Sequence, residues 1–496
     1  MSPYAPESVA PTRIDPVAAS ASEIIGGPLG RYAEPARRAA RSAWQPAAAV
    51  LVGLSSLTVA FGVLQKGHCL TKGWNNPDQF WHACYSDLPV SSGIGHAMPY
   101  LSGAPRLDQP LISGLVMWLV GLAVPDGTVL VRQQWYFALW AVLIAVIVMA
   151  LVIVTAASVP RAPWRAAHVA LSPVLVLAGL ISVDLLGVLL ASVALWAWGR
   201  NKILLSGLVM GLAISARSYP LVLLVAIGLL AVRSGKMGAW ARLAATTLVT
   251  WFAVSLPWLV MNADGLLSVY RSWWRSGSGY GSLWMVSGLL GQSLPQGRVT
   301  ALVILAWVVA MLVGALFALS LDRRPTVAEV SLVILVIVVV TGKAMPVQAG
   351  LWLLPLIALV GLKWRDHLIW AAFEATYFVA VWLYIAGIST PNRGMPAGLY
   401  SVLTVLRVVA WLFVLVQVWR VARSRGPDVS SEPADNEPAD KEPVEPEPVE
   451  REPRDQEPAE RGRLDEHLGS REQDEEADPL AGPMAGAPDE VIVRIS

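Results

Sequence analysis

Three aspartates of this 496-residue chain stand next to long apolar segments. Asp87 and Asp108 occur in the motifs SDLP and LDQP of one loop, and Asp184 occurs in GLISVDLLGV. A carboxylate in such a loop can act as a general base towards a hydroxyl group, or can bind a cation. The nearby prolines also fit turn or helix-capping roles for Asp87 and Asp108. Asp184 is the sharper candidate, because a carboxylate among Leu, Val and Ile is costly at membrane depth, although it can also cap the helix that follows.

Two isolated cations lie in turns between apolar segments. Arg217 occurs with Tyr219 in ISARSYPLVL, and Lys343 occurs with Gln348 in VTGKAMPVQAGLW. A guanidinium fork matches phosphate oxygens and stays charged, whereas an ammonium acts as a point charge. The two cations therefore form a candidate phosphate clamp. The alternative for Arg217 is that its side chain reaches towards lipid headgroups.

Aromatic residues gather in the Gly/Ser-rich stretch VYRSWWRSGSGYGSLWMV, which contains Trp273, Trp274, Tyr280 and Trp284. Aromatic rings beside arginines suit stacking on sugar rings or a position at headgroup depth, and the glycines would allow a mobile lid. With Asp184 and with His96 of the first loop, these are the candidate sugar contacts. Glu374, in WAAFEATYFV, is expected to pair with a neighbouring helix rather than to act in catalysis.

The elements that must position these residues are apolar. The chain is 55% hydrophobic and 15% charged, with a mean hydropathy of +0.54. A membrane-spanning helix needs about 20 apolar residues, so the composition predicts an all-α polytopic membrane protein. Apolar segments occur near residues 47–64, 111–125, 134–157, 166–180, 183–198, 203–216, 219–232, 242–261, 299–320, 327–341, 347–361, 367–388 and 397–421.

Basic clusters assign the sides of these segments. Loops rich in Lys and Arg face the cytoplasm, which places both termini inside and the candidate residues outside. Termini on one side require an even number of crossings, and 111–125 is the weakest segment, short and bounded by prolines. We therefore expect about twelve spans, with 111–125 tilted, re-entrant or interfacial. The long first loop, 66–110, would lie on the extracytoplasmic side.

The chain divides into three parts. Residues 1–44 are expected to be a disordered cytoplasmic N-terminus without a cleavable signal peptide, so that the first span is an uncleaved anchor. Residues 45–425 form the transmembrane domain. The Pro/Glu-rich tail, 426–496, has too little apolar surface to fold and is predicted to be disordered and cytoplasmic.

The two cysteines, Cys69 and Cys84, both fall in the first loop. On an oxidising side they would form a disulfide, and otherwise they would be two unpaired thiols. No Cys/His spacing indicates a metal site. No Walker motif, GxGxxG, HExxH or serine nucleophile elbow occurs, so a membrane enzyme of this kind would need an activated substrate already in the lipid.

Several motifs in order resemble one enzyme family. CYSDLP, LDQPLISGLVMWL, SVDLLGVLLASVALWAW, GLAISARSYPLVLL, GYGSLWMV and VQAGLWLLPLIALVGLKWR with FEATYFVAVWLY resemble the actinobacterial polyprenol-phosphate-mannose-dependent mannosyltransferases. These belong to glycosyltransferase family 87 and have the GT-C membrane fold. The resemblance covers about residues 60–425.

The resemblance implies roles for the candidate residues. Asp87 would be the catalytic base, Asp108 would stand where the family usually has Glu in an EYP-like motif, and Asp184 would match the Asp of a WD-like turn. Arg217 would replace the usual Lys of a KxYP-like motif, next to Tyr219. Lys343 and Gln348 would match a KxxxPQ-like turn. The sequence departs from the family in LDQP, in VSSGIGH after SDLP, and at Ser182 before the acid.

The function that follows is transfer of a sugar, expected to be mannose, from a polyprenyl-phosphate donor to a lipid or glycan acceptor on the extracytoplasmic face. No cofactor is expected beside the lipid-linked donor, and a metal requirement stays open. Expected partners are membrane lipid, the donor and the acceptor, with no nucleic acid and with a cytoplasmic protein for the acidic tail. The alternatives are a transporter or flippase of lipid-linked sugar, an arabinofuranosyltransferase using the same kind of donor, and an envelope-assembly scaffold.

Overall fold

The computed structural model describes residues 44–91, 98–101, 107–424 and 478–493. All elements in these residues are helical. The predicted N-terminal segment and residues 425–477 of the predicted tail lie outside the described residues.

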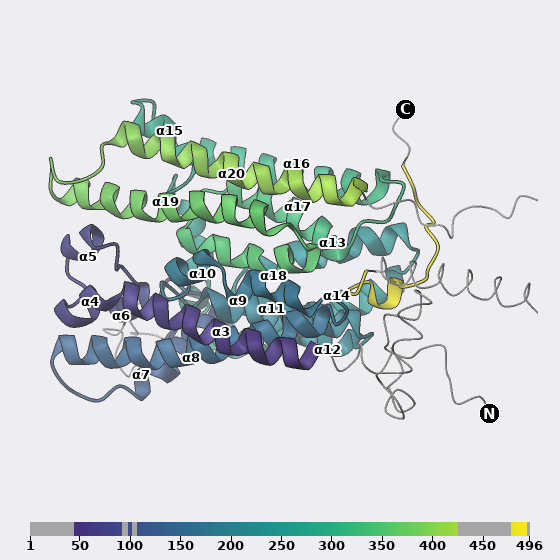
Figure 1. The fold of residues 1–496 in the computed structure, drawn as a ribbon, viewed down its shortest axis with the longest axis horizontal. Coiled ribbons are helices and arrows are strands. Elements are labelled where there is room, and N and C mark those ends of the chain that lie inside the picture. Colours follow the sequence, from purple (N-terminus) through teal and green to yellow (C-terminus); the bar gives the residue numbers. More distant parts are fainter. Residues whose placement is uncertain (1–43, 92–97, 102–106, 425–477, 494–496) are drawn as a thin grey trace, which may run out of the picture.

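Six helices are long and apolar enough to cross a membrane. Their axes run roughly along the long dimension of the molecule (Figure 1). They are α3 (Trp44–Gln65), α8 (Val129–Ser158), α14 (Met237–Arg275), α16 (Gln296–Ser320), α19 (Trp364–Ser389) and α20 (Ala397–Ser424). The chain is therefore a helical membrane protein, as its composition predicted.

The remaining apolar segments form shorter helices, listed here in chain order: α7 (Leu111–Leu122), α11 (Asp184–Gly199), α12 (Ile203–Ala216), α13 (Pro220–Arg233), α17 (Val327–Val340) and α18 (Gly350–Val360). The 12 residues of α7 span only about 18 Å, against a hydrocarbon thickness of about 30 Å. The expected segment 166–180 is divided into η4 (Pro163–Ala166), α9 (Ala167–Ala170) and α10 (Pro173–Ala178), because Ser172 caps a new helix that starts at a proline. The twelve expected spans stay a prediction.

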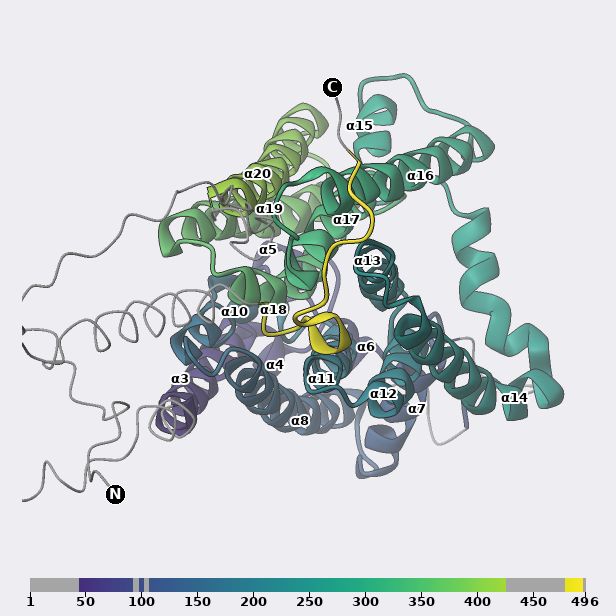
Figure 2. The same ribbon diagram turned by 90° about the vertical axis from the view of Figure 1, so that its right-hand side faces the viewer.

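The helices pack around α17, most of whose side chains are buried. Helix α17 contacts α13, α16, α18 and α20, while α12 lies between α11 and α14, and α3 pairs with α8. Viewed end-on, α18 and α11 lie towards the middle, and α3, α8, α14, α16 and α20 lie around them (Figure 2). Val, Leu and Ile fill α17 without a polar stripe, as expected of a helix surrounded by protein.

Helix α14 is kinked at Asn262, whose backbone is not helical. The Asn262 side chain donates to the carbonyl oxygen of Tyr100, 3.0 Å away, which fixes the bend. After the kink the helix continues as an arm at the edge of the bundle and reaches the start of α16 (Figure 2). There the Gln296 side chain donates to the Trp274 carbonyl.

Part of the acidic tail is folded onto the bundle, which corrects the prediction of disorder over all of 426–496. In residues 478–493, Leu480 and Met484 are each 1% exposed. Asp489 accepts hydrogen bonds from the guanidinium groups of Arg233 and Arg324, each at 2.7 Å. The prediction was wrong for this stretch because it used the average composition of the tail. Two apolar residues that pack on the bundle and one carboxylate that pairs with arginines do not change that average.

This folded tail segment lies at the opposite end of the bundle from α4 (Gly67–Lys72), α5 (Asp78–Trp81) and α6 (Asp87–Ser91) (Figure 1). We refer to the end that carries α4, α5 and α6 as the disulfide end, for the reason given next. Most of the candidate residues lie there.

Candidate active site

The first loop is closed by a disulfide between Cys69 and Cys84, whose Cα atoms are 5.8 Å apart. The sequence left open whether the two cysteines form a disulfide or stay as free thiols, and the structure has the disulfide. The Trp74 indole donates to the Cys84 carbonyl and the Gln65 side chain donates to the Ala83 carbonyl. The loop is thus tied to the end of α3, and it delivers the chain to Asp87 at the start of α6.

Asp87 is half-buried at the start of α6. The Tyr85 hydroxyl donates to its carboxylate at 2.5 Å, and its own backbone N–H donates to the Ile181 carbonyl at 2.8 Å. Burial raises the pKa of Asp87 above its ordinary value, and the neighbouring Asp184 charge raises it further. The Tyr85 hydrogen bond and the cationic Arg217 and Lys66 oppose this rise. A carboxylate with a raised pKa is a better proton acceptor than one in water.

Lys66 is a functional candidate that the sequence did not single out. Its side chain is fully buried, its ammonium donates to the Tyr85 carbonyl at 2.8 Å, and it lies over the Phe378 ring at 5.2 Å. Burial lowers the pKa of Lys66 to about 7, although Asp87 favours its charged form. In the sequence it merely follows the first apolar segment, where a lysine ordinarily reaches for headgroups, so no local signal marks it.

Asp184 and Arg217 form a buried ion pair between the start of α11 and the end of α12. Arg217 Nε donates to Asp184 Oδ1 at 2.8 Å and Nη2 donates to Oδ2 at 3.0 Å. Ser182 and the Trp352 indole also donate to this carboxylate. Asp184 is 2% exposed. No side-chain hydrogen bond caps the start of α11, so the capping role that the sequence also allowed for Asp184 is not the one present.

Only some of the N–H groups of the Arg217 guanidinium are left to bind an anion. Besides the two bonds to Asp184, Nη1 donates to Gln109 Oε1 at 2.7 Å. Three of its five N–H groups are thus directed at protein acceptors, and its charge is balanced by Asp184. Tyr219, 7% exposed, stacks on Trp352 with ring centroids 5.0 Å apart, so a flat aromatic pair adjoins the ion pair.

Asp108 lies apart from this cluster. Its side chain is exposed, and its neighbour Gln109 makes the contact with Arg217. The sequence pattern pointed to Asp108, but the residue whose side chain reaches the cluster is the next one, Gln109. Gln109 and Trp352 were not predicted from the sequence, because a Gln in a loop and a Trp in an apolar helix carry no distinctive spacing.

The Lys343 ammonium is bound by backbone carbonyl groups and is not open to a phosphate, contrary to the predicted clamp. Its ammonium donates to the carbonyl oxygens of Trp273, Trp274 and Ser276, at 2.8, 3.2 and 2.8 Å, and it is 3% exposed. These carbonyls close the end of α14, where a cation is stabilising. Three acceptors use all three ammonium protons. Gln348 lies half-buried in η5 (Val347–Ala349), one turn before α18.

The predicted aromatic contacts divide into two groups. Trp273 is half-buried, lies under Lys343 and stacks on Trp307, and the Trp284 indole donates to the Thr341 carbonyl. Trp274 and Tyr280 are 56% and 42% exposed. Trp273 therefore supports the arm and Trp284 is bound to the turn after α17, whereas Trp274 and Tyr280 expose a large part of their rings. His96 lies outside the described residues.

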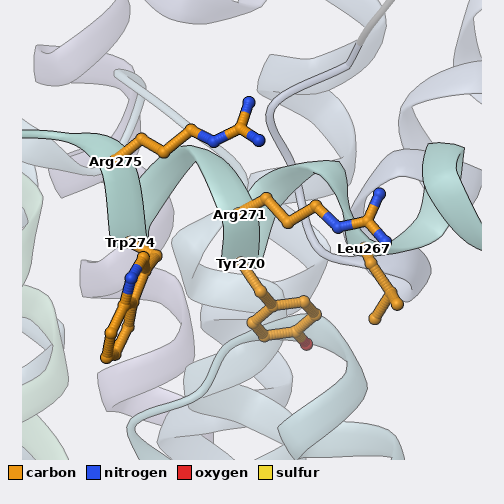
Figure 3. Close-up of a pocket in the computed structure, with 5 residues that line it drawn as sticks. All are labelled: Leu267, Tyr270, Arg271, Trp274 and Arg275. Atoms are coloured by element: carbon orange, nitrogen blue, oxygen red, sulfur yellow. The ribbon is translucent and has the colours of Figure 1, made fainter.

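The arm of α14 carries a shallow groove of about 400 Å³. It is lined by Leu267, Tyr270, Arg271, Trp274 and Arg275. Tyr270 and Trp274 project from one side of the helix and the two guanidinium groups from the other (Figure 3). Aromatic rings on one face and arginines on the other are typical of a helix lying at a membrane interface.

Glu374 pairs with a neighbouring helix, as expected. Arg407 of α20 donates to both of its carboxylate oxygens, at 2.8 and 2.9 Å, and the Trp411 indole donates to the same carboxylate. Arg407 also donates to the carbonyl oxygens of Met345 and Pro346. This buried network therefore holds the turn that contains Lys343.

No protein-family model, curated protein or solved structure matches this chain. Its chemistry must be argued from the site itself.

Proposed function

We propose that the protein is a membrane glycosyltransferase that moves a sugar from a polyprenyl-phosphate donor to a hydroxyl group of a lipid or glycan acceptor. The observation that carries the proposal is the environment of Asp87. It is a half-buried carboxylate with a raised pKa, electrostatically coupled to Lys66, Asp184 and Arg217 at one end of the helical bundle. A binding or scaffold protein has no need of such a base.

In the proposed reaction, Asp87 accepts the proton of the acceptor hydroxyl. The acceptor oxygen then attacks the anomeric carbon, and the bond from that carbon to the phosphate oxygen breaks. The leaving polyprenyl phosphate takes the bonding electron pair. N–H groups of Arg217 that do not bind Asp184 or Gln109 stabilise the developing phosphate charge, and Lys66 helps to keep Asp87 ionised.

The membrane setting explains how the donor reaches this site. The polyprenyl chain lies between spans, and its phosphate reaches Arg217 from headgroup depth. We take the donor sugar to be mannose, on the resemblance to family 87 given above, with a GT-C-like arrangement of about twelve spans. The disulfide fits an extracytoplasmic active site in the cell membrane.

The test is sugar transfer in proteoliposomes that contain the purified protein, a radiolabelled polyprenyl-phosphate mannose and a membrane lipid acceptor fraction. The wild type should form labelled product, Asp87→Asn should form none, and Asp108→Asn should match the wild type because Asp108 is exposed. Product formation at the wild-type rate by Asp87→Asn would refute the assignment of the base. Movement of the donor across the bilayer without product would favour a flippase, and a polyprenyl-phosphate arabinofuranose used in preference to mannose would change only the sugar.

A further inference from the structure

Three potential metal ligands meet in the first loop, outside the proposed active site. His68 Nε2 lies 2.6 Å from Asp78 Oδ2, and His82 Nδ1 lies 3.3 Å from Asp78 Oδ1. One ligand atom from each of the three residues can be chosen so that all lie within 4.8 Å of one another. Two imidazoles and a carboxylate are donors that zinc accepts in proteins.

Two features of the fold bring the three side chains together: the helix α5 and the disulfide. Asp78 and His82 are four residues apart, so they share one face of α5 and its C-terminal end. His68 is adjacent to Cys69, and His82 precedes Cys84 by two residues, so the disulfide carries one histidine to the other. These residues lie on two separate short helices, which is why their spacing in the sequence resembles no metal motif.

His68 and His82 lie next to each other and are both accessible to solvent. Their rings stack with centroids 3.5 Å apart and planes 9° from parallel. The side chains of His68, Asp78 and His82 are 33%, 40% and 45% exposed, which gives an ion access from solvent.

We propose that His68, Asp78 and His82 bind one Zn²⁺ ion that joins α4 to α5 alongside the disulfide. In tetrahedral zinc sites with bonds of about 2.0–2.1 Å, donor atoms lie about 3.3 Å apart. The two rings must therefore turn out of their parallel stack so that a nitrogen lone pair of each points at the same ion. The fourth position faces solvent and takes water. Calcium and magnesium prefer all-oxygen ligands, and ferrous iron is not kept reduced on the side of a membrane where disulfides persist.

The ion would act as a second cross-link of the loop that leads to Tyr85 and Asp87. Phe80 of α5 stacks near Tyr85, and the Trp81 indole donates to the Arg393 carbonyl beyond α19, so α5 is also in contact with the rest of the bundle. The three ligands are bound to one another on α4 and α5, whereas the Asp87 carboxylate accepts from Tyr85, so the site is separate from the proposed base.

The experiment uses full-length protein purified through an affinity tag without histidines, stripped with EDTA, dialysed against Zn²⁺ and measured by elemental mass spectrometry. The wild type should hold one zinc per chain, and His68→Ala, His82→Ala and the near-isosteric Asp78→Asn should each lose it. The matched control is His467→Ala, at a histidine outside the described residues, which should keep the metal. Wild type without zinc, or full zinc in Asp78→Asn and His68→Ala, would overturn the proposal.

A measurement on the wild type alone covers the case in which the variants fail to fold. Diethyl pyrocarbonate modifies accessible imidazole nitrogens, and the modified histidines can be located by mass spectrometry. Zn²⁺ should protect His68 and His82 from modification, and Mg²⁺ at the same concentration should not. Equal modification of both histidines with and without Zn²⁺ would contradict the site.

Discussion

Arg217 donates two parallel hydrogen bonds to Asp184, at 2.8 and 3.0 Å. Asp184 is the first residue of α11 and Arg217 directly follows the last residue of α12, so the pair joins two helix ends. Asp184 is almost fully buried and Arg217 is 13% exposed. The pair therefore fastens two helix ends together and holds the guanidinium in one orientation. Any chemistry that Arg217 performs depends on that anchor.

Removing one member of this pair should cost more than removing both. Asp184→Asn leaves a guanidinium without its counter-charge, and breaking a buried pair in this way costs about 3–5 kcal/mol. The double variant Asp184→Asn with Arg217→Gln should be closer to the wild type than the two single effects predict. Thermal unfolding in detergent measures this double-mutant cycle.

The control for that cycle is the exposed pair Arg271–Asp264, whose side chains are 50% and 83% exposed. Asp264→Asn should leave the unfolding temperature unchanged, because exposed ion pairs contribute little. Equal losses from Asp184→Asn and Asp264→Asn would show that the buried pair is not an anchor.

The pH dependence of transfer should report the pKa of Asp87. The ionised form is the base, so activity falls as pH drops below this raised pKa. The Tyr85 hydrogen bond and the Lys66 charge lower the pKa of Asp87. Tyr85→Phe and Lys66→Met should therefore each raise it and move the acid limb of kcat/KM to higher pH. Asp108→Asn should leave the limb in place. A limb that stays put in Tyr85→Phe argues that another group is the base.

Gly187 gives room to Arg217. A Cβ added at Gly187 would lie 2.9 Å from Cγ and 3.1 Å from Cβ of Arg217, and the shorter contact forces the Arg217 side chain to shift. Gly187→Ala should displace the guanidinium from Asp184, lower transfer activity and lower the unfolding temperature. Gly53→Ala is the matched control, because a Cβ there meets nothing within 4 Å and alanine favours helices. Identical behaviour of the two variants would count against the close approach.

Lys343 should act on the structure of the arm more than on donor binding. Lys343→Met removes the cation that closes the end of α14, so the arm should fray and trypsin should cut sooner after Arg271 and Arg275. Lys363→Met, at an exposed lysine, is the control. If Lys343→Met raises only the KM for donor and leaves the cleavage rate unchanged, Lys343 binds phosphate as the sequence first indicated.

The sequence predicted the features that are local or compositional. Apolar segments located the long helices, Asp184 was identified as a costly carboxylate, Glu374 was expected to pair with a neighbouring helix, and Cys69 and Cys84 were identified as a possible pair. It did not predict Lys66, Gln109 or Trp352, because their importance comes from contacts between segments far apart in the chain. It assigned Lys343 to a phosphate for the same reason: which acceptor a lone cation meets is decided by tertiary packing.

The tail segment that packs at the end of the bundle opposite the disulfide end has a practical consequence for anyone who shortens the chain. Arg233 is fully buried, and Asp489 is its carboxylate partner among the described residues. Composition alone would suggest ending the polypeptide after Ser424. That truncation removes the carboxylate and leaves the carbonyl oxygens of Ala318 and Asp322 as the acceptors of the Arg233 guanidinium. The residues that look most dispensable on paper thus include the counter-ion of a cation sealed inside the protein.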